Sequence, residues 1–114
     1  MSRVRYAVLI NERPEAYAGL SGAERAAITA EYVALRDDAR VTGAERLQPA
    51  STATTVRAAG DELLLTDGPF ADTKEIFGGF YLIEAADLDA ALEFTARIPA
   101  LRFGGSVEIR PLAE

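Results

Sequence analysis

The spacing of hydrophobic and polar residues predicts a strand and a helix in the first third of the chain. The run RVRYAVLI at 3–10 is rich in aliphatic and β-branched residues, and polar residues at 11–13 and Pro14 follow it, as expected for a strand that ends in a loop. Ser21 with Glu24 three residues later forms a capping box, in which both side chains satisfy free amides at a helix start. The apolar stripe of this predicted helix consists of Ile28, Tyr32, Leu35 and Ala39.

The middle of the chain predicts a connection and a hairpin. Residues 44–52 (AERLQPAST) contain a proline and small polar residues, which is typical of a short extended piece followed by a connection. The run TTVRAAGDELLLT at 54–66 predicts two short strands around a turn at Gly60 and Asp61, because both residue types suit tight turns.

The last third predicts two strands with a helix between them. Apolar residues dominate 77–85 (FGGFYLIEA), and a final strand is predicted over 104–112 (GGSVEIRPL). Asp87 can cap the intervening helix, which Pro99 ends. The predicted buried stripe of this helix is Leu88, Ala91, Leu92, Thr95 and Ile98.

The order strand, helix, hairpin, strand, helix, strand predicts an antiparallel sheet with both helices on one face. We therefore expect an α+β fold, a ferredoxin-like subunit that forms a single domain over 1–114. The two central strands of this plan, within 6–10 and 80–85, are apolar at both odd and even positions. Because two helices cover only one face and the long connections are polar, we expect a homodimer in which a second copy covers the other face.

Charge and composition exclude several classes of function. The chain has 12 basic and 18 acidic residues, for a formal net charge of -6, which disfavours direct binding to nucleic acid. It contains neither His nor Cys, so imidazole bases, thiol nucleophiles, disulfides and tetrahedral zinc sites are excluded. No acidic metal-binding motif is present, and we expect neither a metal nor another cofactor. The apolar run at the N-terminus is too short for a signal or membrane segment, so we expect a cytoplasmic protein without membrane contact.

The segment TDGPFADTKEIFGGFYLIEA at 66–85 resembles the DGPF proteins, a branch of the YCII-related family, through its run Asp67, Gly68, Pro69 and Phe70. The resemblance extends over nearly the whole chain. It implies a dimeric α/β barrel built from ferredoxin-like subunits. One relative in the wider group is a dechlorinating enzyme for which a His and Asp pair is proposed. The Asp of such a pair carries over to Asp67, whereas this chain has no His that could supply the other half.

The resemblance and the residue types around the predicted turn indicate a set of candidate site residues. Asp67 is the predicted catalytic acid or base, although Asp before Gly and Pro is equally typical of a structural turn. The predicted substrate-binding residues are Tyr6, Arg13, Lys74, Glu75 and Tyr81. Tyrosines on central strands are more often core residues, and Arg13 also fits a solvated loop charge. A bulge or close packing explains Gly78 and Gly79 better than a phosphate loop, since they open a strand.

Two functions are compatible with the sequence. The first is a small-molecule enzyme or binding protein, for example a small lyase or hydrolase, with a cleft between the barrel and the loop from Asp67 to Glu75. The second follows from the resemblance, because DGPF proteins are often found beside or fused to alternative sigma factors. It is a non-enzymatic partner protein that acts with such a factor in transcription initiation.

Overall fold

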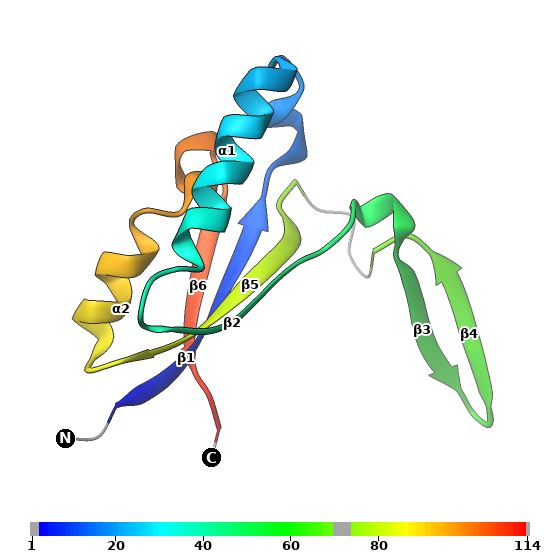
Figure 1. Cartoon of the computed structure of the whole chain (residues 1–114). Coiled ribbons are helices and arrows are strands. Elements are labelled where there is room, and N and C mark those ends of the chain that lie inside the picture. Colours follow the sequence, from blue (N-terminus) through cyan, green and yellow to red (C-terminus); the bar gives the residue numbers. More distant parts are fainter. Residues whose placement is uncertain (1–2, 70–73, 114) are drawn as a thin grey trace.

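The computed structural model describes residues 3–69 and 74–113 and has an α+β fold (Figure 1). Phe70 of the predicted loop lies outside the described residues. The strands are β1 (Val4–Glu12), β2 (Val41–Arg46), β3 (Thr54–Ala59), β4 (Glu62–Asp67), β5 (Ile76–Ala85) and β6 (Ser106–Pro111). The helices are α1 (Gly22–Leu35) and α2 (Leu88–Thr95), with the short 3-10 turns η1 (Pro14–Tyr17), η2 (Ala50–Thr52) and η3 (Pro99–Phe103).

Four strands form one antiparallel sheet in the order β2-β5-β1-β6, and both helices pack on the same face of it (Figure 1). The prediction that the first strand and the strand after the hairpin are central is confirmed. The predicted Ser21 capping box begins α1, with Ser21 and Glu24 each accepting the other's backbone amide. The predicted Asp87 cap begins α2, where its side chain accepts from the Ala90 amide.

The predicted hairpin forms, but it lies outside the sheet, so its assignment to a ferredoxin-like sheet was wrong. Strands β3 and β4 pair only with one another and stand away from the body beside β2 (Figure 1). We call these two strands the arm. The fourth place in the sheet belongs to β2, which sequence analysis treated as a short extended piece. The arm explains why the radius of gyration is 16.2 Å, whereas a compact chain of this length would have about 13 Å.

The core lies between the sheet and the helices. Alternate residues of β1 and β5 face it, including Val8 and Ile83, which are almost fully buried. They pack with Phe94 of α2 and with Ile98, which follows the end of that helix. The predicted stripe of the first helix ran too long, because α1 ends at Leu35 and leaves Ala39 exposed. The predicted stripe of the second helix was partly wrong. Ala91, Thr95 and Ile98 are buried as expected, but Leu88 and Leu92 are exposed, because the buried face of α2 turns toward Phe94.

An ion-pair network holds the start of β2 against α2. The carboxylate of Asp38 accepts hydrogen bonds from Arg40 at 2.7 Å and from Arg97 at 2.6 Å. Its side chain is only 12% exposed. Hydrogen bonds from Arg40 hold the pKa of this carboxyl well below its usual value.

The opposite face of the sheet, which we call the open face, has no helix over it. Its centre consists of Ala7 and Leu9 from β1 and of Phe80 and Leu82 from β5, which pair as Ala7 with Leu82 and Leu9 with Phe80. All four side chains are partly exposed. The sequence could not say which of Leu82 and Ile83 faces the helices, and the structure shows that Ile83 does.

Candidate functional site

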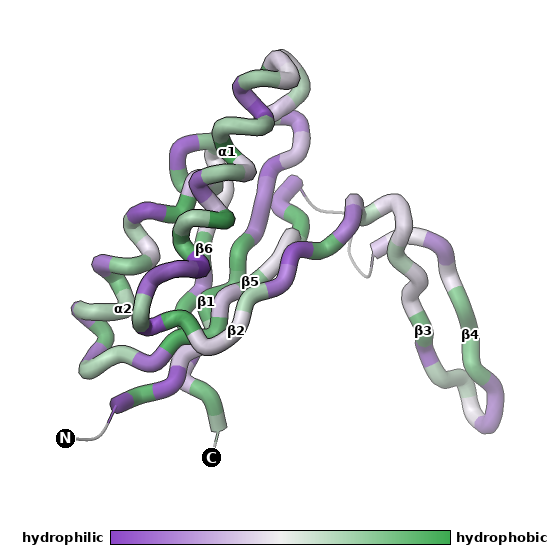
Figure 2. Tube along the Cα trace, in the orientation of Figure 1, coloured by the Kyte–Doolittle hydropathy of each residue, from purple (hydrophilic) through white to green (hydrophobic). Residues whose placement is uncertain are grey.

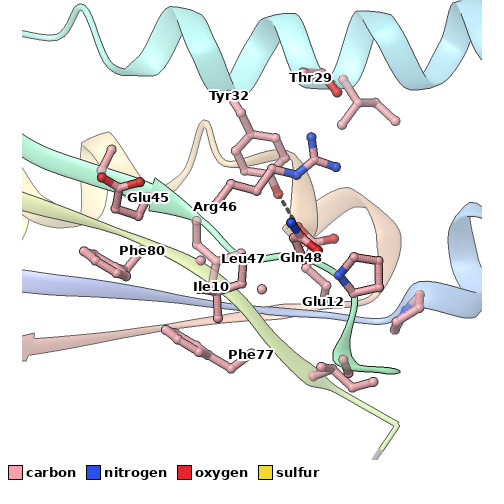
Figure 3. A pocket seen from close by; sticks show the side chains of 18 of the residues that line it. Ile10, Glu12, Thr29, Tyr32, Glu45, Arg46, Leu47, Gln48, Phe77 and Phe80 are labelled. Atoms are coloured by element: carbon pink, nitrogen blue, oxygen red, sulfur yellow. Dashed lines mark hydrogen bonds between the residues drawn. The ribbon is translucent and has the colours of Figure 1, made fainter. Parts of the chain in front are cut away.

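A cavity of about 700 Å³ lies where α1 passes over one end of the sheet. Its walls are α1, the ends of β1 and β5, and the segment from Ala44 to Ser51, which comprises the end of β2 and the start of the connection to the arm. Most of the lining is apolar, as in many small-molecule sites. Figure 3 shows polar side chains from three different segments that converge on this space.

A bulge in β5 shapes the floor of the cavity. The pairing of β1 with β5 shifts between Ile10 and Asn11, opposite Gly79 and Phe77. Gly79 is needed here because a Cβ at this position would lie 2.6 Å from the backbone oxygen of Glu45. The bulge confirms the expectation for the two glycines and places Phe77 and Phe80 together on the side of β5 away from α1 (Figure 3). Both line the cavity, which therefore reaches the open face at this end of the sheet.

A carboxylate with two tyrosines lies at the inner end. The Tyr32 hydroxyl donates to Glu12 Oε1 at 2.9 Å (Figure 3). It also accepts from the Ala100 amide at 3.1 Å. The Tyr17 hydroxyl is buried without a well-formed hydrogen bond to any described residue. Burial, and then the nearby Glu12 carboxylate, raise the pKa of both tyrosines. Both phenols are therefore neutral near pH 7 and can serve as hydrogen-bond donors.

Three arginines line the cavity, and the side chains of two of them make no hydrogen bond or ion pair with any described residue. Arg25 is occupied, because it donates to the backbone oxygens of Tyr17 and Leu20. Arg36 follows the end of α1, and Arg46 ends β2 with its side chain directed toward α1 (Figure 3). Both are exposed. Two guanidinium groups over an apolar cavity favour an anionic ligand.

Three of the predicted site residues lie on the chain beside the arm. Asp67 is the last residue of β4 and is exposed opposite Thr54, at the base of the arm. Lys74 and Glu75 are exposed immediately before β5. None of these three residues lines the cavity in the described part of the chain. The structure therefore places these three residues outside the lining of this cavity.

The other predicted residues lie in the body. Tyr6 is a core residue, and Tyr81 is also buried but borders the cavity. The Tyr81 hydroxyl donates to the backbone oxygen of Tyr32 at 2.6 Å, and burial raises its pKa to about 12. Arg13 pairs with Glu15 at 3.2 Å, and its side chain passes over Gly104.

Sequence reasoning missed Glu12, Tyr17, Tyr32, Arg36 and Arg46 as site residues. Glu12 and Tyr32 lie 20 positions apart and meet only because α1 crosses the end of β1. Sequence analysis treated the segment that carries Arg46 as a connection without chemistry. A weak signal existed, since Arg46 and Gln48 lie in a predicted connection and binding residues are often found on loops.

The described residues contain no group of three or more acidic side chains placed to hold a metal ion. No helix in the described part of the chain is long and apolar enough to cross a membrane. The polar groups of the cavity are phenols, carboxylates, amides and guanidiniums. These groups bind organic molecules through hydrogen bonds and charge.

The fold and cavity define a small α+β protein with one helix-covered face and a side cavity. The model of the YCII-related domain family matches residues 4–114, and the chain belongs to this family. It is also 49% identical, over 69 residues, to a protein of Rhizobium meliloti (strain 1021) that is named as uncharacterized. That alignment covers 60% of this chain and 56% of the relative, so the chain spans little more than half of that protein.

Proposed function

We propose that this protein binds a small organic anion with an apolar body in the cavity under α1. The observation that carries this proposal is the pair Arg36 and Arg46, whose guanidinium groups make no hydrogen bond or ion pair with a described residue and lie over an apolar lining. A carboxylate, sulfonate or phosphate would pair with them. Ile28 and Leu47, which line the same space, would contact the apolar body of the ligand.

Glu12 gives the inner end of the cavity a group that can accept a hydrogen bond or a proton. It is held by the Tyr32 hydroxyl, and the buried Tyr17 hydroxyl lies close by. A ligand hydroxyl that reaches this end would meet one acceptor and two neutral phenols. If the ligand is transformed by a lyase or hydrolase reaction, Glu12 is the acid or base that this geometry supports.

The test compares two probes that differ in charge and little in shape, 1-naphthoate and 1-naphthamide. Titration followed by calorimetry should show tighter binding of the naphthoate. Arg46→Ala should weaken naphthoate binding by at least about tenfold, which is about 1.4 kcal/mol, whereas Arg3→Ala, at an exposed position outside the cavity, should not change it. Equal affinity for the two probes, or equal effects of the two variants, would exclude the proposal.

The role of Asp67 as an acid or base stays a prediction, and Asp67→Asn tests it. The amide keeps the size of the side chain but cannot take a proton. Loss of a ligand or an activity in a normally folded variant would support the prediction. If stability instead falls by more than about 1 kcal/mol while binding is unchanged, Asp67 is a turn residue.

We also propose that two copies associate through the open face to form the dimeric barrel that the family resemblance implies. The support is the partly exposed apolar centre of this face, and mainly its large residues Leu9, Phe80 and Leu82. Leu82→Asp should give a folded monomer in sedimentation experiments. Ile83→Asp should unfold the chain, because Ile83 is 1% exposed in the core. A wild-type protein that sediments as a monomer at micromolar concentration would contradict this proposal.

The alternative role, as a partner of a sigma factor, remains a prediction from the resemblance. A pull-down with the full chain tests it. Stoichiometric retention of a sigma factor would support the partner role, whereas a copurified metabolite released from the cavity would support the small-molecule role.

A further inference from the structure

The arm is an amphipathic ribbon whose apolar side faces solvent. The pairing of β3 with β4 places Val56, Ala58, Leu63 and Leu65 on one face, which we call the apolar face of the arm. Leu63 is 71% exposed, Leu65 is 68% exposed and Val56 is 54% exposed. The other face carries mainly polar residues. Figure 2 shows the hydrophobic segments along both strands of the arm.

Such a ribbon is not expected to remain without a partner. Every residue of β4 is exposed, and so is every residue of β3 except Thr55. A two-stranded hairpin is at best marginally stable in water unless its apolar face packs against something. An exposed apolar face of this kind marks an interaction site.

The available area fits a second copy of this chain as the occupant. With strands about 4.8 Å apart and a rise of about 3.4 Å per residue, the four-stranded open face covers about 500 Å² and one face of the arm about 200 Å². The open face alone falls short of the roughly 800 Å² that a stable interface buries on each partner. The open face, the arm and the surface under the partner's arm together give about 900 Å², which reaches this value.

The arm is also continuous with one wall of the cavity. The segment from Leu47 to Ser51 lines the cavity and leads directly into β3. The backbone of this segment is hydrogen-bonded to the body where the Leu47 amide donates to the Gly78 oxygen at 2.9 Å. Among the described residues, the other backbone hydrogen bonds of this connection are local or run to the arm, such as that from the Gly68 amide to the Ala53 oxygen at 2.7 Å. This wall is therefore joined to the arm at one end and bonded to the body at the other, with η2 lying near β5.

We propose that the arm of each copy docks through its apolar face on a second copy, and that this contact holds the wall from Leu47 to Ser51 in place. The proposal goes beyond self-association through the open face, because it makes the cavity depend on the partner. Because the cavity reaches the open face at Phe77 and Phe80, the docked copy also borders it.

Crosslinking with mixed isotopes tests where the arm docks. A photoreactive benzoylphenylalanine replaces Leu65 on the apolar face or, as a control, Thr66 on the other face. Unlabelled and ¹⁵N-labelled chains are mixed and exchanged before irradiation. Position 65 should give crosslinked peptides that combine one light and one heavy chain, at least fivefold more than position 66. Crosslinks confined to one chain, or equal yields at both positions, would overturn the proposal.

Paired charge substitutions test the consequence for dimer and cavity. Leu63→Asp with Leu65→Asp charges the apolar face, and Leu64→Asp with Thr66→Asp adds the same charge to the other face. The first pair should raise the dimer dissociation constant by at least tenfold and weaken naphthoate binding by at least threefold. The second pair should change each by less than twofold. Equal effects of the two pairs, or a monomeric wild type, would contradict the docking. If the first pair weakens the dimer and leaves naphthoate binding intact, the cavity does not depend on the arm.

That outcome is distinguishable from failure of the proposed binding function. In the latter case the wild type itself would fail to prefer naphthoate over naphthamide. The crosslinking result does not depend on any ligand.

Discussion

Removal of the Tyr32 hydroxyl tests the hydrogen-bonded centre of the cavity. Tyr32→Phe keeps the ring and its packing, but it deletes the bonds to Glu12 at 2.9 Å and from the Ala100 amide at 3.1 Å. Ala100 is fully buried, so its amide is left without an acceptor. A buried unpaired amide costs roughly 1–3 kcal/mol, and a hydrogen bond to a charged group contributes about 1.5–3 kcal/mol. Since water in the cavity can partly solvate Glu12, we expect a net loss of about 2 kcal/mol.

The assay is urea unfolding at neutral pH, followed by far-UV circular dichroism. Tyr81→Phe is the matched control, because it removes one phenol from the same region but only one hydrogen bond, that to the Tyr32 backbone oxygen. It should cost about 1 kcal/mol. Substitutions at the protein surface usually change the free energy of unfolding by no more than about 0.5 kcal/mol. If the free energy of unfolding of Tyr32→Phe differs from that of the wild type by no more than this, the hydroxyl does not bridge Glu12 and Ala100.

Three other changes follow from the structure. Asp38→Asn should cost about 2 kcal/mol at neutral pH, as expected for lost charge-assisted bonds. The pKa of Asp38 is lowered in the folded protein, so the wild type loses this stabilisation as the pH falls below the ordinary value of 3.8. The difference in unfolding free energy between Asp38→Asn and the wild type should therefore shrink below that pH, as measured by urea unfolding at several pH values. The pKa of Tyr81 is raised from 10.0 to about 12 in the folded protein, so its contribution to folding stability is present below pH 10.0 and is lost as the pH rises above that value. The stability of Tyr81→Phe should therefore fall less steeply at alkaline pH than that of the wild type. Gly79→Ala should lower the thermal midpoint sharply, because its Cβ would lie 2.6 Å from the Glu45 oxygen, whereas Gly22→Ala, with nothing within 4 Å, should not.

The elements that local chemistry specifies could be predicted from the sequence. The capping box at Ser21 and the cap at Asp87 each depend on residues within one helical turn. The two central strands were also predictable, because the runs at 6–10 and 80–85 are apolar at both odd and even positions. A strand with a neighbour on each side buries more of its surface than an edge strand. The ends of the helices were less accurate, since the turn through Asp38 depends on contacts with Arg97 in a distant element.

The place of the hairpin and the composition of the cavity could not be predicted in this way. The run from Leu63 to Leu65 is apolar enough for a sheet, and nothing local distinguishes a strand in the sheet from one in an arm. Glu12 and Tyr32 become neighbours only through the crossing of α1 over the sheet. Asp67 was predicted as the catalytic residue because it belongs to a recognisable sequence motif. Arg46 was missed because it lies in a stretch that resembles a simple connection.

The central claim is that the cavity under α1 binds a small organic anion through Arg36 and Arg46. The most direct measurement is the calorimetric affinity of 1-naphthoate for the wild type, for Arg46→Ala and for Arg3→Ala, with 1-naphthamide as the neutral probe. We predict that naphthoate binds more tightly than naphthamide and that only Arg46→Ala removes this preference, with a loss of at least about tenfold. A wild type that binds both probes equally, or that binds neither, would contradict the account.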